Sequence, residues 1–146
     1  MRADAYPGPM TYAGDVAARD AFRALAADED AVLVDVRTTA EWNYVGLPDL
    51  SGLGKQVVCL EWQRFPDGSL NESFVQQLEA SGAQPGQAVY FLCRSGVRSR
   101  AAAEAATAAG LGPAYNISDG FEGPLDREGH RALSGWKHDG LPWRQG

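Results

Sequence analysis

The residues best suited to chemistry follow a short apolar run, residues 88–92, whose pattern predicts a buried strand. Cys93 ends that run, and an alanine-rich stretch typical of a helix follows soon after it. The loop between them carries arginines, hydroxyls and a glycine; it comprises Arg94, Ser95, Gly96, Val97, Arg98 and Ser99. The helix dipole and the arginines favour a thiolate at that junction. The sequence therefore predicts that Cys93 is a nucleophile in a loop whose backbone N–H groups bind an anion.

The other candidate groups give weaker signals. A buried structural role is the common alternative for a cysteine, but the polar loop after Cys93 argues against it there. Cys59 lies inside the apolar run 57–60, so we interpret it as a packing residue; a resolving thiol for Cys93 is the alternative. His130 and His138 stand in polar, glycine-rich surroundings without ligand spacing. We therefore expect exposed histidines, no metal and no cofactor.

A second polar group follows another apolar run, residues 31–34. Asp35 and Arg37 come directly after it, and Glu41 lies four residues beyond Arg37, a spacing that allows an ion pair on a helix. Carboxyl ends of parallel strands meet at one edge of a sheet, so these residues should lie near Cys93. We interpret all three as supports for the neighbouring loops rather than as reacting groups.

Short apolar strands alternate with helical patterns along the chain. We expect strands at 31–34, 57–60, 88–92 and 114–117, and helices at 15–27, 38–44, 71–81 and 99–109. Asp15 would cap the first helix, and Ser99 is either a ligand of the anion or the cap of the last helix. This alternation predicts an α/β fold with a mainly parallel central sheet flanked by helices on both faces. Residues 1–11 should form a loop and residues 12–146 a single domain.

The composition and net charge of the chain limit the classes of partner that it can bind. The chain has 146 residues, a net charge of −6 and 45% hydrophobic residues, which is ordinary for a globular protein. The negative charge argues against nucleic acid and anionic membranes, whereas the local arginine cluster suits a small anion. The first residues lack the apolar segment of a signal peptide, and the two cysteines form no CxxC pair. We therefore expect a cytoplasmic location.

The motifs resemble those of single-domain rhodaneses, a sulfurtransferase family. Residues 92–99 look like the active-site loop of that family, and residues 33–37 with Glu41 and Trp42 are similar to its Asp-Val-Arg…Glu-aromatic signature. Residues 117–121 resemble the glycine-containing segment after the last core strand, and residues 140–142 the usual ending. The motifs occur in the expected order over residues 12–143, and the resemblance implies a rhodanese-like domain.

The resemblance also implies an activity, that of a thiosulfate sulfurtransferase. Cys93 would take the outer sulfur of a small anionic donor such as thiosulfate and carry it as a persulfide. Cyanide, a thiol or a protein would then accept the sulfur. The loop from Arg94 to Ser99 would surround the persulfide, and Arg94 and Arg98 would steer the donor.

Two alternative functions and several departures from the family pattern accompany this interpretation. Cysteine-based phosphatases and arsenate reductases place five residues between cysteine and arginine, but four separate Cys93 from Arg98 here. A persulfide relay or a binding module for a partner protein is the other alternative. The family's histidine before Leu47 is absent, and Gly123 and Pro124 replace a common tryptophan, for which Trp136 could substitute in packing. Residues 49–68 form a longer stretch than usual, and we hypothesise that residues 59–65 within it, which include Trp62, overhang the Cys93 pocket and shape access for the acceptor.

Overall fold

The structure, a computed structural model, describes residues 11–131 and 133–145. A central sheet has the strand order β1-β6-β5-β2-β4, and its strands pair in parallel. These strands are β1 (Gly14–Val16), β2 (Val32–Asp35), β4 (Val58–Cys59), β5 (Pro85–Leu92) and β6 (Gly112–Ile117). The predicted α/β fold with a mainly parallel sheet is therefore confirmed. The loop predicted for residues 1–11 lies, except for Thr11, outside the described residues.

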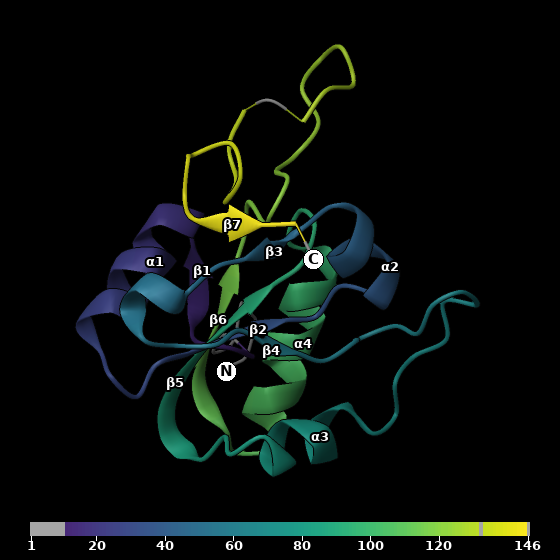
Figure 1. The fold of residues 1–146 in the computed structure, drawn as a ribbon. Helices are drawn as coiled ribbons and strands as arrows, with labels where there is room; N and C mark the ends of the chain where they lie inside the picture. Colours follow the sequence, from purple (N-terminus) through teal and green to yellow (C-terminus); the bar gives the residue numbers. More distant parts are fainter. Residues whose placement is uncertain (1–10, 132, 146) are drawn as a thin grey trace, which may run out of the picture.

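Helices cover both faces of this sheet (Figure 1). On one face lies α1 (Ala18–Ala27), whose Ala18, Ala21 and Leu25 are fully buried. On the other face lie α3 (Phe74–Ala80) and α4 (Val97–Ala108), and two short helices, α2 (Thr39–Tyr44) and the 3₁₀ helix η1 (Ser51–Leu53), follow β2 and β3. The two layers of helices give the sheet an apolar core on each side, as a buried parallel sheet requires.

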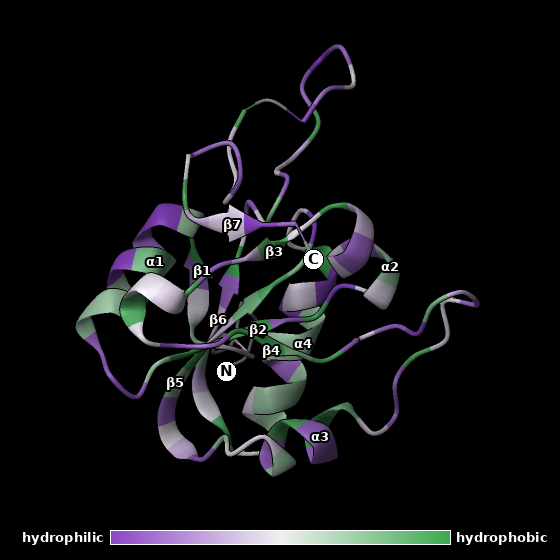
Figure 2. Ribbon diagram, viewed as in Figure 1, coloured by the Kyte–Doolittle hydropathy of each residue, from purple (hydrophilic) through white to green (hydrophobic). Residues whose placement is uncertain are grey.

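Alanine content explains how closely α4 packs. Its buried positions include Ala102, Ala103 and Ala106, which are small enough to bring the helix axis near β5 and β6. Figure 2 shows α4 mostly in the pale green of weakly hydrophobic residues and the outer side of α1 in hydrophilic purple. The core under α4 also contains Cys93. The loop that carries the thiol is therefore fixed against a tightly packed helix.

A second, two-stranded sheet joins distant parts of the chain. Strand β3 (Leu47–Pro48) pairs antiparallel with β7 (Trp143–Arg144), so the tail lies beside the segment after α2 (Figure 1). The sequence does not predict β1, β3 or β7, because strands of two or three residues are too short for apolar periodicity to show. Trp136 is fully buried in the core on the α1 face, which confirms its expected packing role.

Three predicted helix starts were wrong, and one of them is that of α3, which begins at Phe74 rather than at Asn71. Asp15 belongs to β1, and α1 begins three residues later, where the Ala18 N–H donates to Asp119 Oδ1 at 2.9 Å. A residue 101 positions away thus caps the helix, which local sequence cannot reveal. Helix α4 begins at Val97 rather than Ser99 and has Gly96 as its N-cap, so Ser99 is not the cap. None of the described helices has both the length and the apolar character needed to cross a membrane.

Candidate active site

Cys93 directly follows β5, the central strand, and only 1% of its surface is exposed. Its Sγ accepts a hydrogen bond from the Gly96 N–H at 3.1 Å and lies 3.2 Å from Ser99 Oγ. The first N–H groups of any α-helix have no carbonyl partner within the helix. The sulfur therefore lies at the N-terminus of α4, where free donors and the helix dipole favour negative charge.

Two glycines let two loops pack backbone against backbone at this point. Gly96 has φ +104°, and a Cβ there would collide with the Ser118 carbonyl. Gly120 has φ +66°, and a Cβ there would collide with the Arg94 carbonyl. The Phe121 N–H donates to the Cys93 carbonyl at 2.8 Å. The glycine segment after β6 thus holds the cysteine loop in shape, which explains in physical terms why both glycines occur.

Arg98 forms an ion pair with Glu41. Its Nη1 and Nη2 donate to the Glu41 carboxylate oxygens at 2.7 and 3.0 Å, and both side chains are about one-fifth exposed. Glu41 also accepts from Thr38 in a capping box that begins α2. The predicted pair between Arg37 and Glu41 was wrong, because Arg37 turns into the interior instead.

Arg37 and Asp35 form a fully buried ion pair behind the loop. The guanidinium donates from Nη2 to Asp35 Oδ2 at 2.7 Å and from Nε to Oδ1 at 3.0 Å. Nη2 also donates to the Gly46 carbonyl at 2.7 Å, and the guanidinium carbon lies 4.3 Å from the centre of the Phe121 ring. This pair therefore connects the end of β2 to the segments before β3 and after β6.

The remaining loop arginines differ in their partners. Arg94 is about half exposed and its Nε lies 3.5 Å from Glu122 Oε2. Arg100 is exposed, and its guanidinium carbon lies 5.7 Å from the centre of the Tyr12 ring. Val97 is 78% exposed. The loop thus presents less unpaired positive charge than its sequence indicates, because its two arginines nearest the thiol each have a carboxylate partner.

A line of polar side chains beneath the thiol was not predicted from the sequence. Ser99 Oγ donates to Asn116 Oδ1 at 2.6 Å, and Asn116 Nδ2 donates to Asp15 Oδ1 at 3.0 Å. The Tyr12 hydroxyl donates to the same carboxylate oxygen at 2.9 Å. Asn116 is 3% exposed in β6, the neighbour of β5. An asparagine inside the apolar strand pattern 114–117 was the signal that could have revealed it, because buried polar side chains need partners.

Cys59 lies in β4, beside Asp35 of β2. Burial, and next the charge of Asp35, raise the pKa of the Cys59 thiol to about 11, so it stays protonated at neutral pH. Trp62 packs edge to face on Phe74 with ring centres 5.2 Å apart, which gives it a structural role whatever its effect on access of the acceptor to the site.

Among the described residues, no group of three or more His, Cys, Asp or Glu side chains could hold a metal ion.

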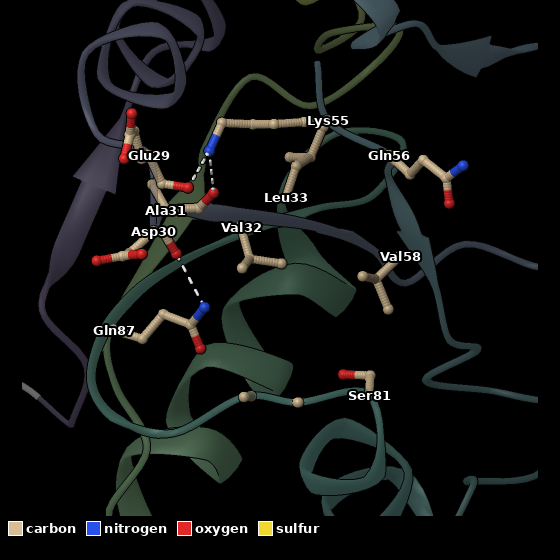
Figure 3. Close-up of a pocket in the computed structure, with 12 residues that line it drawn as sticks. Glu29, Asp30, Ala31, Val32, Leu33, Lys55, Gln56, Val58, Ser81 and Gln87 are labelled. Carbon is tan, nitrogen blue, oxygen red and sulfur yellow. Dashed lines mark hydrogen bonds between the residues drawn. The ribbon is translucent and has the colours of Figure 1, made fainter. Parts of the chain in front are cut away.

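A separate hollow of about 270 Å³ lies at the opposite ends of the strands, near the start of β2 (Figure 3). Lys55 reaches over it, but its Nζ donates to the carbonyls of Asp28, Glu29 and Ala31 at 2.8 to 3.0 Å. An ammonium group has three protons, so this lysine is fully used in joining two loops. The hollow is therefore not the site of the predicted chemistry.

The pair between Glu41 and Arg98 predicts a pH-dependent stability difference. Burial opposes ionisation of Glu41, but the hydrogen bond and charge of Arg98 outweigh it and lower the Glu41 pKa below 4.5. The stabilisation is therefore present above the unfolded-state pKa and lost as pH falls through the folded-state pKa. We expect Glu41→Gln to cost about 1–3 kcal/mol of unfolding free energy at neutral pH and less at an acidic pH at which the wild-type Glu41 carboxylate becomes protonated. Urea unfolding at both pH values measures this, and an equal cost at both would contradict it.

Comparison with known proteins places this chain in a family. The model of the STR4 middle domain matches residues 13–146. The uncharacterized protein RC0915 of Rickettsia conorii is 39% identical over 131 residues, which span 89% of this chain and 96% of that protein. Rhodanese-like domain-containing protein 4 of Arabidopsis thaliana, a chloroplast protein, is 32% identical over 89% of this chain but only 25% of its own length.

Solved structures agree with the fold. The crystal structure of Rv0390 from M. tuberculosis has a TM-score of 0.84 and 54% identity, covering 92% of this chain and 99% of that one. The polysulfide-sulfur transferase of Wolinella succinogenes has a TM-score of 0.60 at 22% identity over 89% of this chain and 77% of its own, which shows a shared fold alone. With the family match spanning the described domain, the chain belongs to the STR4 middle domain family, within the rhodanese-like superfamily.

Proposed function

We propose that this protein is a sulfurtransferase in which Cys93 accepts a sulfane sulfur and carries it as a persulfide. The observation that supports this most is the setting of Cys93 Sγ, which lies at the end of the central strand with the Gly96 N–H on it. The N-terminus of α4 faces the same point. Such a site stabilises a thiolate or an anionic outer sulfur without any metal. Membership of the rhodanese-like superfamily supports the same reaction class.

The reaction has two half-reactions. After Cys93 has lost its proton to solvent, its thiolate attacks the outer sulfur of thiosulfate; a new S–S bond forms and the donor's S–S bond breaks. Sulfite leaves with the electron pair of the broken bond, and Cys93 holds an anionic persulfide. Cyanide or a thiolate then attacks the outer sulfur, giving thiocyanate or a new persulfide and regenerating the Cys93 thiolate.

The loop residues have separate roles in this proposal. The N–H groups from Arg94 to Ser99 surround the outer sulfur, and Gly96 permits the close approach. Arg94 and Arg98 attract the anionic donor. Because Glu122 and Glu41 pair with these arginines, the site also suits donors less charged than thiosulfate, such as persulfides of thiols. Asp35, Arg37 and Glu41 hold the surrounding segments and do not touch the sulfur.

Initial-rate kinetics test this proposal. Donors should include thiosulfate, inorganic polysulfide and mercaptopyruvate, and acceptors should include cyanide, a small thiol and a protein thiol. We expect parallel lines in double-reciprocal plots, because a persulfide intermediate gives ping-pong kinetics. The acceptor arms separate an enzyme acting on small molecules from a relay to a partner protein. Intersecting lines, or no transfer from any donor, would overturn the proposal.

A further inference from the structure

The direction of each hydrogen bond beneath Cys93 can be assigned from chemistry alone. A carboxylate only accepts, so Asp15 Oδ1 must receive protons from both Tyr12 and Asn116. Asn116 therefore turns its NH₂ group toward Asp15 and its carbonyl oxygen toward Ser99. That oxygen has no proton to give, and the Ser99 hydroxyl has only one. At 2.6 Å, the Ser99 proton is committed to Asn116.

The hydrogen bond to Asn116 determines whether Ser99 can donate or only accept a hydrogen bond at the Cys93 sulfur. Because the Ser99 hydroxyl donates its proton in the hydrogen bond to Asn116, Ser99 Oγ presents only a lone pair to Cys93 Sγ, 3.2 Å away. The contact is then a hydrogen bond only while Cys93 is protonated and its S–H donates to Ser99. A thiolate would instead meet a lone pair. Rotation of the hydroxyl toward the sulfur would leave Asn116 Oδ1 without its proton at a position 3% exposed.

We infer that Asn116, oriented by Asp15, fixes the Ser99 hydroxyl as an acceptor, so that the hydroxyl is a hydrogen-bond partner of the Cys93 thiol but not of its thiolate. Asn116 and Asp15 are positioning residues, since they act through Ser99 and touch no sulfur in the contacts described. The significance for sulfur transfer rests on the proposed function, but the hydrogen-bond assignment does not. The inference reverses one of the two roles expected for Ser99 from the sequence, that of a hydrogen-bond donor to the bound anion; the other, the helix cap, is excluded by the start of α4.

Few charged groups surround the thiol, and the test substitution at Ser99 leaves all of them in place. Arg98 of α4 and its partner Glu41 of α2 lie on one side, and the Asp35–Arg37 pair follows β2. Arg94, in the loop itself, has Glu122 as its partner. Substitution of Ser99 changes none of them. A change in thiol titration caused by that substitution therefore reports the hydroxyl and not a charge.

The test measures the ultraviolet absorbance of the Cys93 thiolate against pH in a Cys59→Ala background, where Cys93 is the only cysteine. Ser99→Ala removes the acceptor of the thiol proton. We expect about threefold to tenfold more thiolate at a pH below the midpoint, the size of one ordinary hydrogen bond. Ser118→Ala, which removes a nearby exposed hydroxyl bonded to Val16, is the matched control and should change nothing. A decrease of thiolate in Ser99→Ala would overturn the inference.

Substitutions of Asp15 test the upstream step at a residue that is itself exposed and lies on the edge strand β1. Asp15→Ala releases the Asn116 amide, which can then donate to Ser99 and free its proton for the sulfur, so thiolate should increase. Asp15→Asn removes the same charge but keeps an oxygen for Asn116, so its effect should be smaller. In a Ser99→Ala background, Asp15→Ala should add nothing. Equal effects of Asp15→Ala with and without Ser99 would show a charge effect alone and overturn the inference.

These outcomes are independent of sulfur transfer. If no donor forms a persulfide, the titrations still answer the hydrogen-bond question. If the titrations fail while a persulfide forms, the proposed function stands without the positioning role.

Discussion

Replacing Cys93 with alanine is expected to abolish sulfur transfer from every donor that the wild-type protein uses. The persulfide requires a sulfur atom at the end of β5, and the other thiol, Cys59, stays protonated because its pKa is raised to about 11. Loss of a nucleophile in covalent catalysis typically lowers the rate by a thousandfold or more, and we expect about that loss of kcat/KM. Initial rates of thiocyanate formation from thiosulfate and cyanide measure it.

The matched control is Cys59→Ala, which removes the second cysteine at a half-buried position in β4. Its transfer rate should stay within about twofold of wild type, because Cys59 belongs to the packing beside Asp35 and not to the loop. Cys93→Ser tests whether a similar shape with a hydroxyl suffices, and it should be as inactive as the alanine variant. Equal losses in the Cys59 and Cys93 variants would place the chemistry elsewhere.

Replacing Arg37 with alanine should be the most destabilising of the proposed substitutions. The change would leave the Asp35 carboxylate fully buried without its bidentate partner and remove the bond to the Gly46 carbonyl and the stacking on Phe121. Breaking a buried ion pair on one side costs about 3–5 kcal/mol. Urea unfolding at neutral pH should show this loss of unfolding free energy.

An exposed ion pair supplies the control for Arg37. Arg23 and Asp20 are 3.3 Å apart on the outer side of α1, and both side chains are more than half exposed. Because water screens such a pair, Arg23→Ala should cost no more than about 0.5 kcal/mol. The double variant Asp35→Ala with Arg37→Ala should be less destabilised than two independent losses would add up to, since it leaves no uncompensated charge. Similar costs for Arg23→Ala and Arg37→Ala would contradict the supporting role of the buried pair.

The sequence predicted those features whose determinants are local. The strand before Cys93, the helix after it and the loop between them are adjacent in the chain, so apolar runs, helix formers and a glycine were enough to place them. The carboxyl end of β2 was also placed correctly beside the loop, because parallel strands align their ends. The Val36 N–H donates to the Leu92 carbonyl at 2.8 Å, as that alignment requires.

Features that depend on contacts between residues far apart in the sequence were not predicted. Asp119 caps α1 across 101 positions, and Arg98 pairs with Glu41 across 57. Spacing on one helix favoured Arg37 as the partner of Glu41, but burial of Arg37 against Asp35 excluded that choice. Charge pairing is set by which side chains the fold brings into contact, and a single sequence does not contain that information. The sequence therefore indicated only that Asn116, inside an apolar strand, needs partners; that these partners are Ser99 and Asp15 depends on the fold.

Mass spectrometry of the intact protein and its peptides after exposure to sulfane-sulfur donors tests the central claim most directly. The Cys59→Ala variant should gain the mass of one sulfur atom, located on the peptide that contains Cys93, and adding cyanide should remove it. Iodoacetate added first should block the gain. No added sulfur with thiosulfate, polysulfide or mercaptopyruvate, or an unchanged gain in Cys93→Ala, would contradict the account.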